Sequence, residues 1–131
     1  MISRLPFISS ALAGASGVGL GAFGAHALRG RLIELGHLET WQTAVHYHLL
    51  HAVALLALAV LAAVQPRRLA CWIAAFWAAG IVLFSGSLYW YSFSGPYFVV
   101  YLTPLGGVCF LVGWLLLLFW NNSPRPASSG A

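Results

Sequence analysis

Apolar side chains fill four long stretches of the chain, and short polar segments separate them. The stretches cover roughly residues 5–28, 43–64, 69–91 and 98–120. Each has about the 20 residues that a helix needs to cross a bilayer, and backbone groups in lipid must hydrogen bond within their own helix. The pattern therefore predicts an all-α integral membrane protein, with a bundle of four transmembrane helices forming a single domain over residues 1–120.

Two polar segments complete the predicted architecture. Between residues 28 and 40, leucines recur at helical spacing and Gly36 follows as a stop signal, which predicts a short interfacial helix between the first two spans. The alternative is an ordinary polar hairpin. Thr40 is in position to cap the second span. Residues 121–131 are rich in Pro, Ser and Gly, so we expect a disordered polar tail.

Composition makes lipid the solvent of this fold. Of the 131 residues, 61% are hydrophobic and only 6% are charged, which is too few to cover a water-soluble domain. The net charge of +4 comes from arginines at the ends of the apolar stretches. Because no basic face with interleaved aromatics is present, nucleic acid is not an expected partner. The expected partners are the lipid bilayer and either a second copy of the chain or a larger membrane complex.

The arginines also predict an orientation. Four of the six basic residues flank the side that holds both chain ends: Arg4, Arg67, Arg68 and Arg125. Arg29 and Arg31 fall on the opposite side. Cytoplasmic flanks of membrane helices carry an excess of Arg and Lys, so both termini are predicted to be cytoplasmic.

Small residues recur every four positions along the first span: Ser9, Ala13, Gly17, Gly21 and Ala25. A row of this kind lets a second helix approach closely, and close packing drives helix association in lipid. We expect the row to meet another helix of the same protomer. Contact with a second copy or with a partner protein is the alternative.

Three histidines, His46, His48 and His51, lie near the start of the second span. On a helix His48 and His51 lie about 60° apart, whereas His46 lies about 140° to 160° from both, so one face cannot hold all three. A metal site formed by His48, His51 and His26, or haem held by histidines of facing helices, is the alternative. Because no second motif supports such a site, we expect no metal and no cofactor.

The depth of the polar residues in the membrane explains them better than a metal or haem site does. By helical rise, His51 lies about 12 Å inside the outer face, and serines and a threonine of the later spans reach a similar depth. The predicted polar layer consists of His26, His51, Ser85, Ser87 and Thr103. Because an unpaired polar group in lipid is costly, these groups should hydrogen bond to one another. We expect His51 to be neutral, with one donor and one acceptor nitrogen.

The fourth span is interrupted by Thr103 and Pro104. Inside a helix, Pro104 would leave the carbonyl of Val100 without its usual N–H partner. Alternatively, Thr103 caps a helix that begins with Pro104. In both cases irregular backbone is expected near the outer face.

Five separated motifs carry a resemblance to a known family: GAFGAHAL (21–28), TAVHYHLLHAVALL (43–56), LFSGSLY (83–89), TPLGG (103–107) and GW (113–114). In this order they are similar to the small four-helix membrane proteins of domain-of-unknown-function family 423, which has a eukaryotic transmembrane branch. The resemblance implies four spans and a bacterial inner (plasma) membrane location, but no activity. It marks His26, His51, Ser85, Gly86, Ser87, Thr103 and Pro104, whereas His46 and His48 look individual to this chain.

Two classes of function compete. We favour a non-enzymatic scaffold or accessory protein of a membrane complex. The alternative is a small carrier or channel that binds a solute, ion or proton at an outer-leaflet polar layer centred on His51. An enzyme is disfavoured because the sequence has no Asp or Lys and no carboxylate within the spans. A sealed polar layer beside an exposed groove of small residues would favour the accessory protein, and a hydrated path would favour the carrier.

Overall fold

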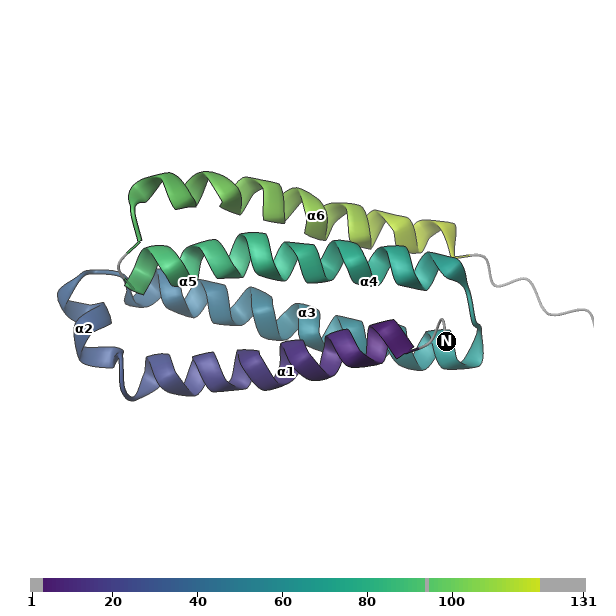
Figure 1. Cartoon of the computed structure of the whole chain (residues 1–131), viewed down its shortest axis with the longest axis horizontal. Coiled ribbons are helices and arrows are strands. Elements are labelled where there is room, and N and C mark those ends of the chain that lie inside the picture. Colours follow the sequence, from purple (N-terminus) through teal and green to yellow (C-terminus); the bar gives the residue numbers. More distant parts are fainter. Residues whose placement is uncertain (1–3, 94, 121–131) are drawn as a thin grey trace, which may run out of the picture.

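Four long helical rods run side by side in the computed structural model of the chain, which describes residues 4–93 and 95–120 (Figure 1). Each rod is long and apolar enough to cross a membrane. The prediction of an all-α, four-helix membrane protein is therefore confirmed. The tail predicted over residues 121–131, with Arg125, lies outside the described residues.

The first two rods are regular helices joined by a short one. α1 spans Arg4–Ala25, α2 spans Arg29–Glu34 and α3 spans Leu38–Val64. α2 crosses the end of the bundle, as the leucine pattern predicted (Figure 1). Gly36 follows its C-cap with φ +69°, a left-handed conformation that glycine adopts without a steric penalty. The predicted cap at Thr40 is wrong, because the N-cap of α3 is His37, three residues earlier.

A π-helical segment interrupts the third rod, and no sequence pattern predicted it. The rod consists of α4 (Arg68–Gly80), the π segment η1 (Ile81–Ser85) and α5 (Gly86–Phe93). At its end the N–H of Gly86 donates to the carbonyl of Ile81, five residues earlier. The extra residue per turn changes which side chains of the later half face the bundle.

The fourth rod begins irregularly, as expected. It consists of the 3₁₀ turn η2 (Tyr97–Tyr101), α6 (Leu102–Leu116) and the 3₁₀ turn η3 (Leu117–Phe119). Tyr101 occupies the N-cap position, so the alternative in which Thr103 caps this helix is wrong. Pro104 lies in the first turn of α6, where an N–H has no partner within its own helix.

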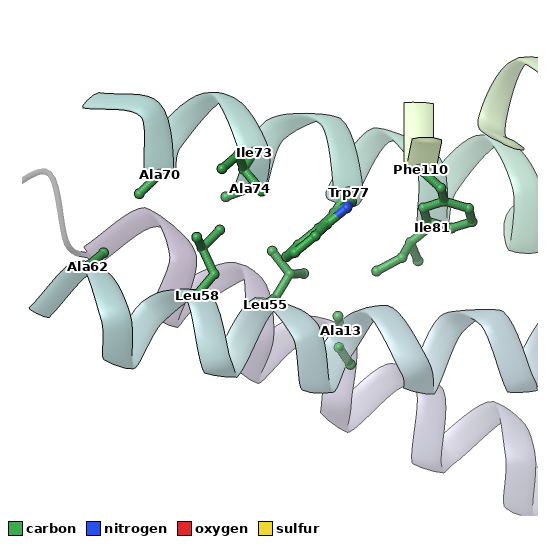
Figure 2. Packing of buried hydrophobic residues seen from close by; sticks show 11 residues of the cluster. Ala13, Leu55, Leu58, Ala62, Ala70, Ile73, Ala74, Trp77, Ile81 and Phe110 are labelled. Carbon is green, nitrogen blue, oxygen red and sulfur yellow. The ribbon is translucent and has the colours of Figure 1, made fainter. Parts of the chain in front are cut away.

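The apolar core lies mainly between α3 and α4. Figure 2 shows Trp77 of α4 reaching toward Leu55 of α3, with Leu58 and Ile73 beside them. Farther along, Ala62, Ala70 and Ala74 are buried at the same interface. Small side chains at this end let the two rods approach closely, which gives van der Waals contact where lipid offers no hydrophobic driving force between helices.

Glycines set the spacing where other rods meet. A Cβ built on Gly106 of α6 would collide with the backbone of Phe84 in η1, and one on Gly113 would collide with the indole of Trp77. The fourth rod therefore packs against the third with its bare backbone. This close approach holds η1 against α6.

The row of small residues on α1 faces α3. A Cβ on Gly17 would lie 2.7 Å from Cδ2 of Leu49, and one on Gly21 would lie 3.2 Å from Cγ1 of Val45. Gly24, which was not in the predicted row, packs against the indole of Trp41. Ala25, the last member of the row, is exposed. The row thus contacts a helix of the same protomer along most of its length.

Replacement of Gly106 by alanine should destabilise the bundle by about 1 to 3 kcal/mol, because its methyl group must displace the Phe84 backbone. Gly107→Ala is the matched control, since its Cβ would lie 3.9 Å from Cδ2 of Phe84, an ordinary contact. Both variants gain the same helix propensity. Unfolding in mixed detergent and SDS micelles, followed by circular dichroism, measures the difference. Equal stabilities would contradict the close approach.

Candidate functional site

His51 lies inside the bundle with each ring nitrogen bound by a partner of fixed role. The residue is 2% exposed. Its Nδ1 lies 2.8 Å from the carbonyl oxygen of Tyr47, one turn earlier, and its Nε2 lies 3.1 Å from the indole Nε1 of Trp114 on α6. A carbonyl only accepts and an indole N–H only donates. The ring is therefore a neutral imidazole with its proton on Nδ1.

Aromatic side chains from the third and fourth rods enclose this imidazole. It stacks on the ring of Phe110 at 3.6 Å between centroids, with 12° between the planes. The rings of Trp77 and Trp114 meet it edge-on, each with its centroid 6.1 Å away. His51 thus joins α3 to the third and fourth rods, and it sits in an apolar cage.

Ser87 and Thr103 form a second, separate contact. Their hydroxyl oxygens lie 2.7 Å apart and link α5 to α6. Because the Ser87 hydroxyl donates to the carbonyl of Phe84 at 2.9 Å, Thr103 is the donor between the two. Ser85, in the π segment, is 0% exposed, and its Oγ has no hydrogen-bond partner among the described residues.

The predicted polar residues therefore do not form one network. Only Ser87 and Thr103 hydrogen bond to each other, whereas His51 is paired with Tyr47 and Trp114. His26 is exposed, because α1 ends at Ala25 and the chain turns toward α2 before this side chain can enter the bundle. Equal depth did not bring these groups into contact.

His48, which looked individual to this chain in the family resemblance, is buried and hydrogen bonds to two other rods. It is 4% exposed; its Nε2 lies 3.2 Å from the Ser16 hydroxyl on α1, and its Nδ1 lies 3.2 Å from the Tyr89 hydroxyl on α5. The signal for its burial was its spacing of about 60° from His51 on the same helix. His46, on the other face, is exposed.

The described residues contain no group of three or more His, Cys, Asp or Glu side chains that could hold a metal ion. His26, His48 and His51, the set considered from the sequence, lie apart with separate partners. The chemistry that this arrangement offers is hydrogen bonding between helices.

Two grooves lie beside these contacts. The first, the α1–α3 groove, has a volume of about 570 Å³ and is lined by Gly21, Gly24 and Ala25 of α1 and by residues of α3. The second, the α1–α4 groove, has a volume of about 460 Å³ and includes Ser16, His48 and Tyr89 in its lining. Open space is therefore found on both sides of α1.

Loss of the Trp114 indole should destabilise the fold through His51. Trp114→Phe removes the only donor that the described residues offer to a buried Nε2, and an unsatisfied buried acceptor costs about 1 to 3 kcal/mol. Trp72→Phe is the control, since Trp72 is 65% exposed. Reversible unfolding in SDS-containing micelles measures both variants. If Trp114→Phe were no less stable than Trp72→Phe, the pairing with His51 would have no energetic role.

The chain is similar to known membrane proteins along most of its length. The family model described as "Protein of unknown function (DUF423)" matches residues 20–107. The UPF0382 inner membrane protein YgdD of Escherichia coli K12 is 44% identical over 123 residues, which cover 90% of this chain and 89% of the relative.

Two further relatives come from other bacteria. The UPF0382 membrane protein YwdK of Bacillus subtilis is 43% identical over 105 residues, 77% of this chain and 82% of the relative. A UPF0382 membrane protein of Haemophilus influenzae is 40% identical over 109 residues, 83% of this chain and 86% of the relative. No solved structure matches the chain.

Proposed function

Given that the chain belongs to the DUF423 family of proteins of unknown function, we propose that it is a non-enzymatic accessory protein of a larger complex in the bacterial inner membrane. The location is supported by the Escherichia coli relative, which is named an inner membrane protein. The role rests on one observation, the α1–α3 groove.

The α1–α3 groove has the features of a docking site for a transmembrane helix. Gly21, Gly24 and Ala25 form its α1 wall, where Val45 and Trp41 of α3 already pack over Gly21 and Gly24, and Leu50 and Val53 give the α3 wall an apolar surface. A helix that enters this groove can pack closely against the small side chain of Ala25 and the apolar α3 wall, and such close packing is how helices associate in lipid.

One end of the α1–α3 groove is polar, and this feature restricts the partner. The guanidinium of Arg29, the amide of Gln42 and the imidazole of His46 line it. These groups suit a partner helix that carries a carboxylate or another acceptor at the same membrane face, because Arg offers several fixed donors to a carboxylate. The proposed occupant is therefore a helix of a different protein with an acidic residue at one end.

The hydrogen bonds of His51 support this role over that of a carrier or channel. A proton added to Nε2 would face the N–H of Trp114, so two donors would oppose each other. Nδ1 already donates to the Tyr47 carbonyl. A proton or ion site centred on His51 would need this aromatic cage to open.

Filling the α1–α3 groove should release the partner. In membranes solubilised with a mild detergent, the wild-type chain is expected to migrate in a complex larger than its own oligomers on blue native gels. Ala25→Trp should shift it to the free form, since residue 25 is exposed and lines the groove. Ala15→Trp, at an exposed position of α1 outside the groove, should leave the complex intact.

Three outcomes would contradict the accessory role. They are a wild-type chain that migrates alone, two variants that behave alike, and co-purification of two differently tagged copies that fully accounts for the larger species. The last would identify a second copy as the occupant. Thermal stability of the purified variants should match that of the wild type, which separates loss of binding from misfolding.

In this proposal both chain termini lie on the cytoplasmic side. Arg4 begins α1, Arg67 and Arg68 lie where α3 connects to α4, and Arg29 and Arg31 belong to α2. The start of α1 and the α3–α4 connection lie at one end of the bundle, and α2 lies at the other (Figure 1). The excess of basic residues at the first end supports this orientation. A C-terminal green fluorescent protein fusion should fluoresce and a C-terminal alkaline phosphatase fusion should be inactive in a Gram-negative host. Active phosphatase would reverse the orientation.

A further inference from the structure

The α1–α4 groove combines an apolar wall with a short chain of polar groups. α1 and the α4–α5 rod form its sides, and Leu55 and His48 of α3 contribute to its lining. Most of the remaining lining is aliphatic, including Leu12, Ile81 and Val82. No Arg, Lys, Asp or Glu side chain is among its described lining residues.

The polar side chains of the lining are Ser9, Ser16, His48 and Tyr89, and the last three form one continuous hydrogen-bonded chain across three rods. The Ser16 hydroxyl also lies 2.7 Å from the carbonyl of Leu12, to which it donates. With that proton used, Ser16 accepts from Nε2–H of His48, and Nδ1 accepts from the Tyr89 hydroxyl. Tyr89 then keeps a lone pair that can accept a further hydrogen bond.

This chain can also run in the opposite direction. A hydroxyl is both donor and acceptor, and neutral imidazole can carry its proton on either nitrogen. If Ser16 donates to Nε2, then Nδ1–H donates to Tyr89, and the Tyr89 O–H is free to donate. The bond from Ser16 to Leu12 is lost in this arrangement, so an acceptor beside Tyr89 would have to compensate. The Tyr89 hydroxyl at the end of this hydrogen-bonded chain can therefore accept from a hydroxyl of a ligand or donate to a carbonyl.

Depth and charge restrict what could bind here. His48 lies about 15 Å along α3 from its start, and Ser16 lies about 18 Å along α1, at the level of the hydrocarbon core. A phospholipid headgroup does not reach this depth and would require cationic groups, which the described lining lacks. Acyl chains bring no oxygen to this level. The occupant must be uncharged and lipid-soluble, with a polar oxygen that enters the hydrocarbon region.

We infer that the α1–α4 groove binds an uncharged ring with a carbonyl or hydroxyl oxygen and an apolar tail, the chemistry of an isoprenoid quinone or quinol. The ring lies between α1 and the α4–α5 rod, and its oxygen bonds to Tyr89. A quinone accepts from the Tyr89 O–H and a quinol donates to it, which uses the two directions of the hydrogen-bonded chain. This site is distinct from the α1–α3 groove, so its test is independent of the accessory role.

Binding of radiolabelled decylubiquinone to the full chain in lipid nanodiscs tests the inference, with empty nanodiscs correcting for partition into lipid. Gly86→Leu places a side chain in the groove, and a Cβ at this position meets only the Ile81 carbonyl, at 3.9 Å. The expected result is saturable binding at one site, weakened at least about tenfold by Gly86→Leu. Gly19→Leu is the matched control, since its Cβ would have no neighbour within 4 Å and it lies outside the groove.

Two further measurements test the role of the oxygen. Tyr89→Phe should weaken binding roughly three- to tenfold, the effect of one hydrogen bond. Decylbenzene, which has a ring and tail but no oxygen, should fail to compete. Binding that never saturates, equal affinity in Gly86→Leu and Gly19→Leu, or full competition by decylbenzene would each overturn the inference. Because Gly86→Leu leaves the polar chain intact, the test holds even where Tyr89→Phe folds poorly.

Discussion

Lipid offers no hydrogen-bond partner, so a polar side chain within a span is stabilised only by a partner on its own helix or on a neighbour. In this protein these pairings connect all four rods. His51 bonds to Trp114, Ser87 bonds to Thr103, and His48 bonds to both Ser16 and Tyr89. A change of register between two rods would leave buried donors or acceptors unpaired. The polar residues therefore specify which helix lies against which, in addition to the packing energy that holds the rods together.

Several motifs that carry the family resemblance supply glycines at which two rods pack closely. TPLGG supplies Gly106, whose bare backbone meets Phe84 of LFSGSLY, and GW supplies Gly113, which meets the indole of Trp77. Gly24 of GAFGAHAL meets Trp41. Each pair places a glycine on one rod against a bulky side chain or the backbone of another. Motifs of this kind determine how the rods pack. The family match can therefore be strong even though the motifs contain no evident reacting group.

Local patterns were sufficient to predict the spans, the short helix α2 and the turn at Gly36, because hydrophobic length, leucine spacing and glycine conformation are properties of short segments. The site was less predictable. Counting residues gave the depth of His26 but not the point at which α1 ends, and this left the side chain outside the bundle. The π segment and the partners of His48 depend on how rods pack, which the sequence of one rod does not contain.

His48 and His51 show how partners decide what a buried histidine can do. They lie three residues apart on one face of α3, yet a carbonyl and an indole hold His51, and each can play only one part. Two hydroxyls hold His48, and each can donate or accept. Moving the proton of His51 to its other nitrogen breaks both of its bonds. Moving the proton of His48 keeps both bonds to the hydroxyls and loses only the bond from Ser16 to the carbonyl of Leu12. A ligand that changes between acceptor and donor can therefore be accommodated at His48, beside an open groove, and not at His51.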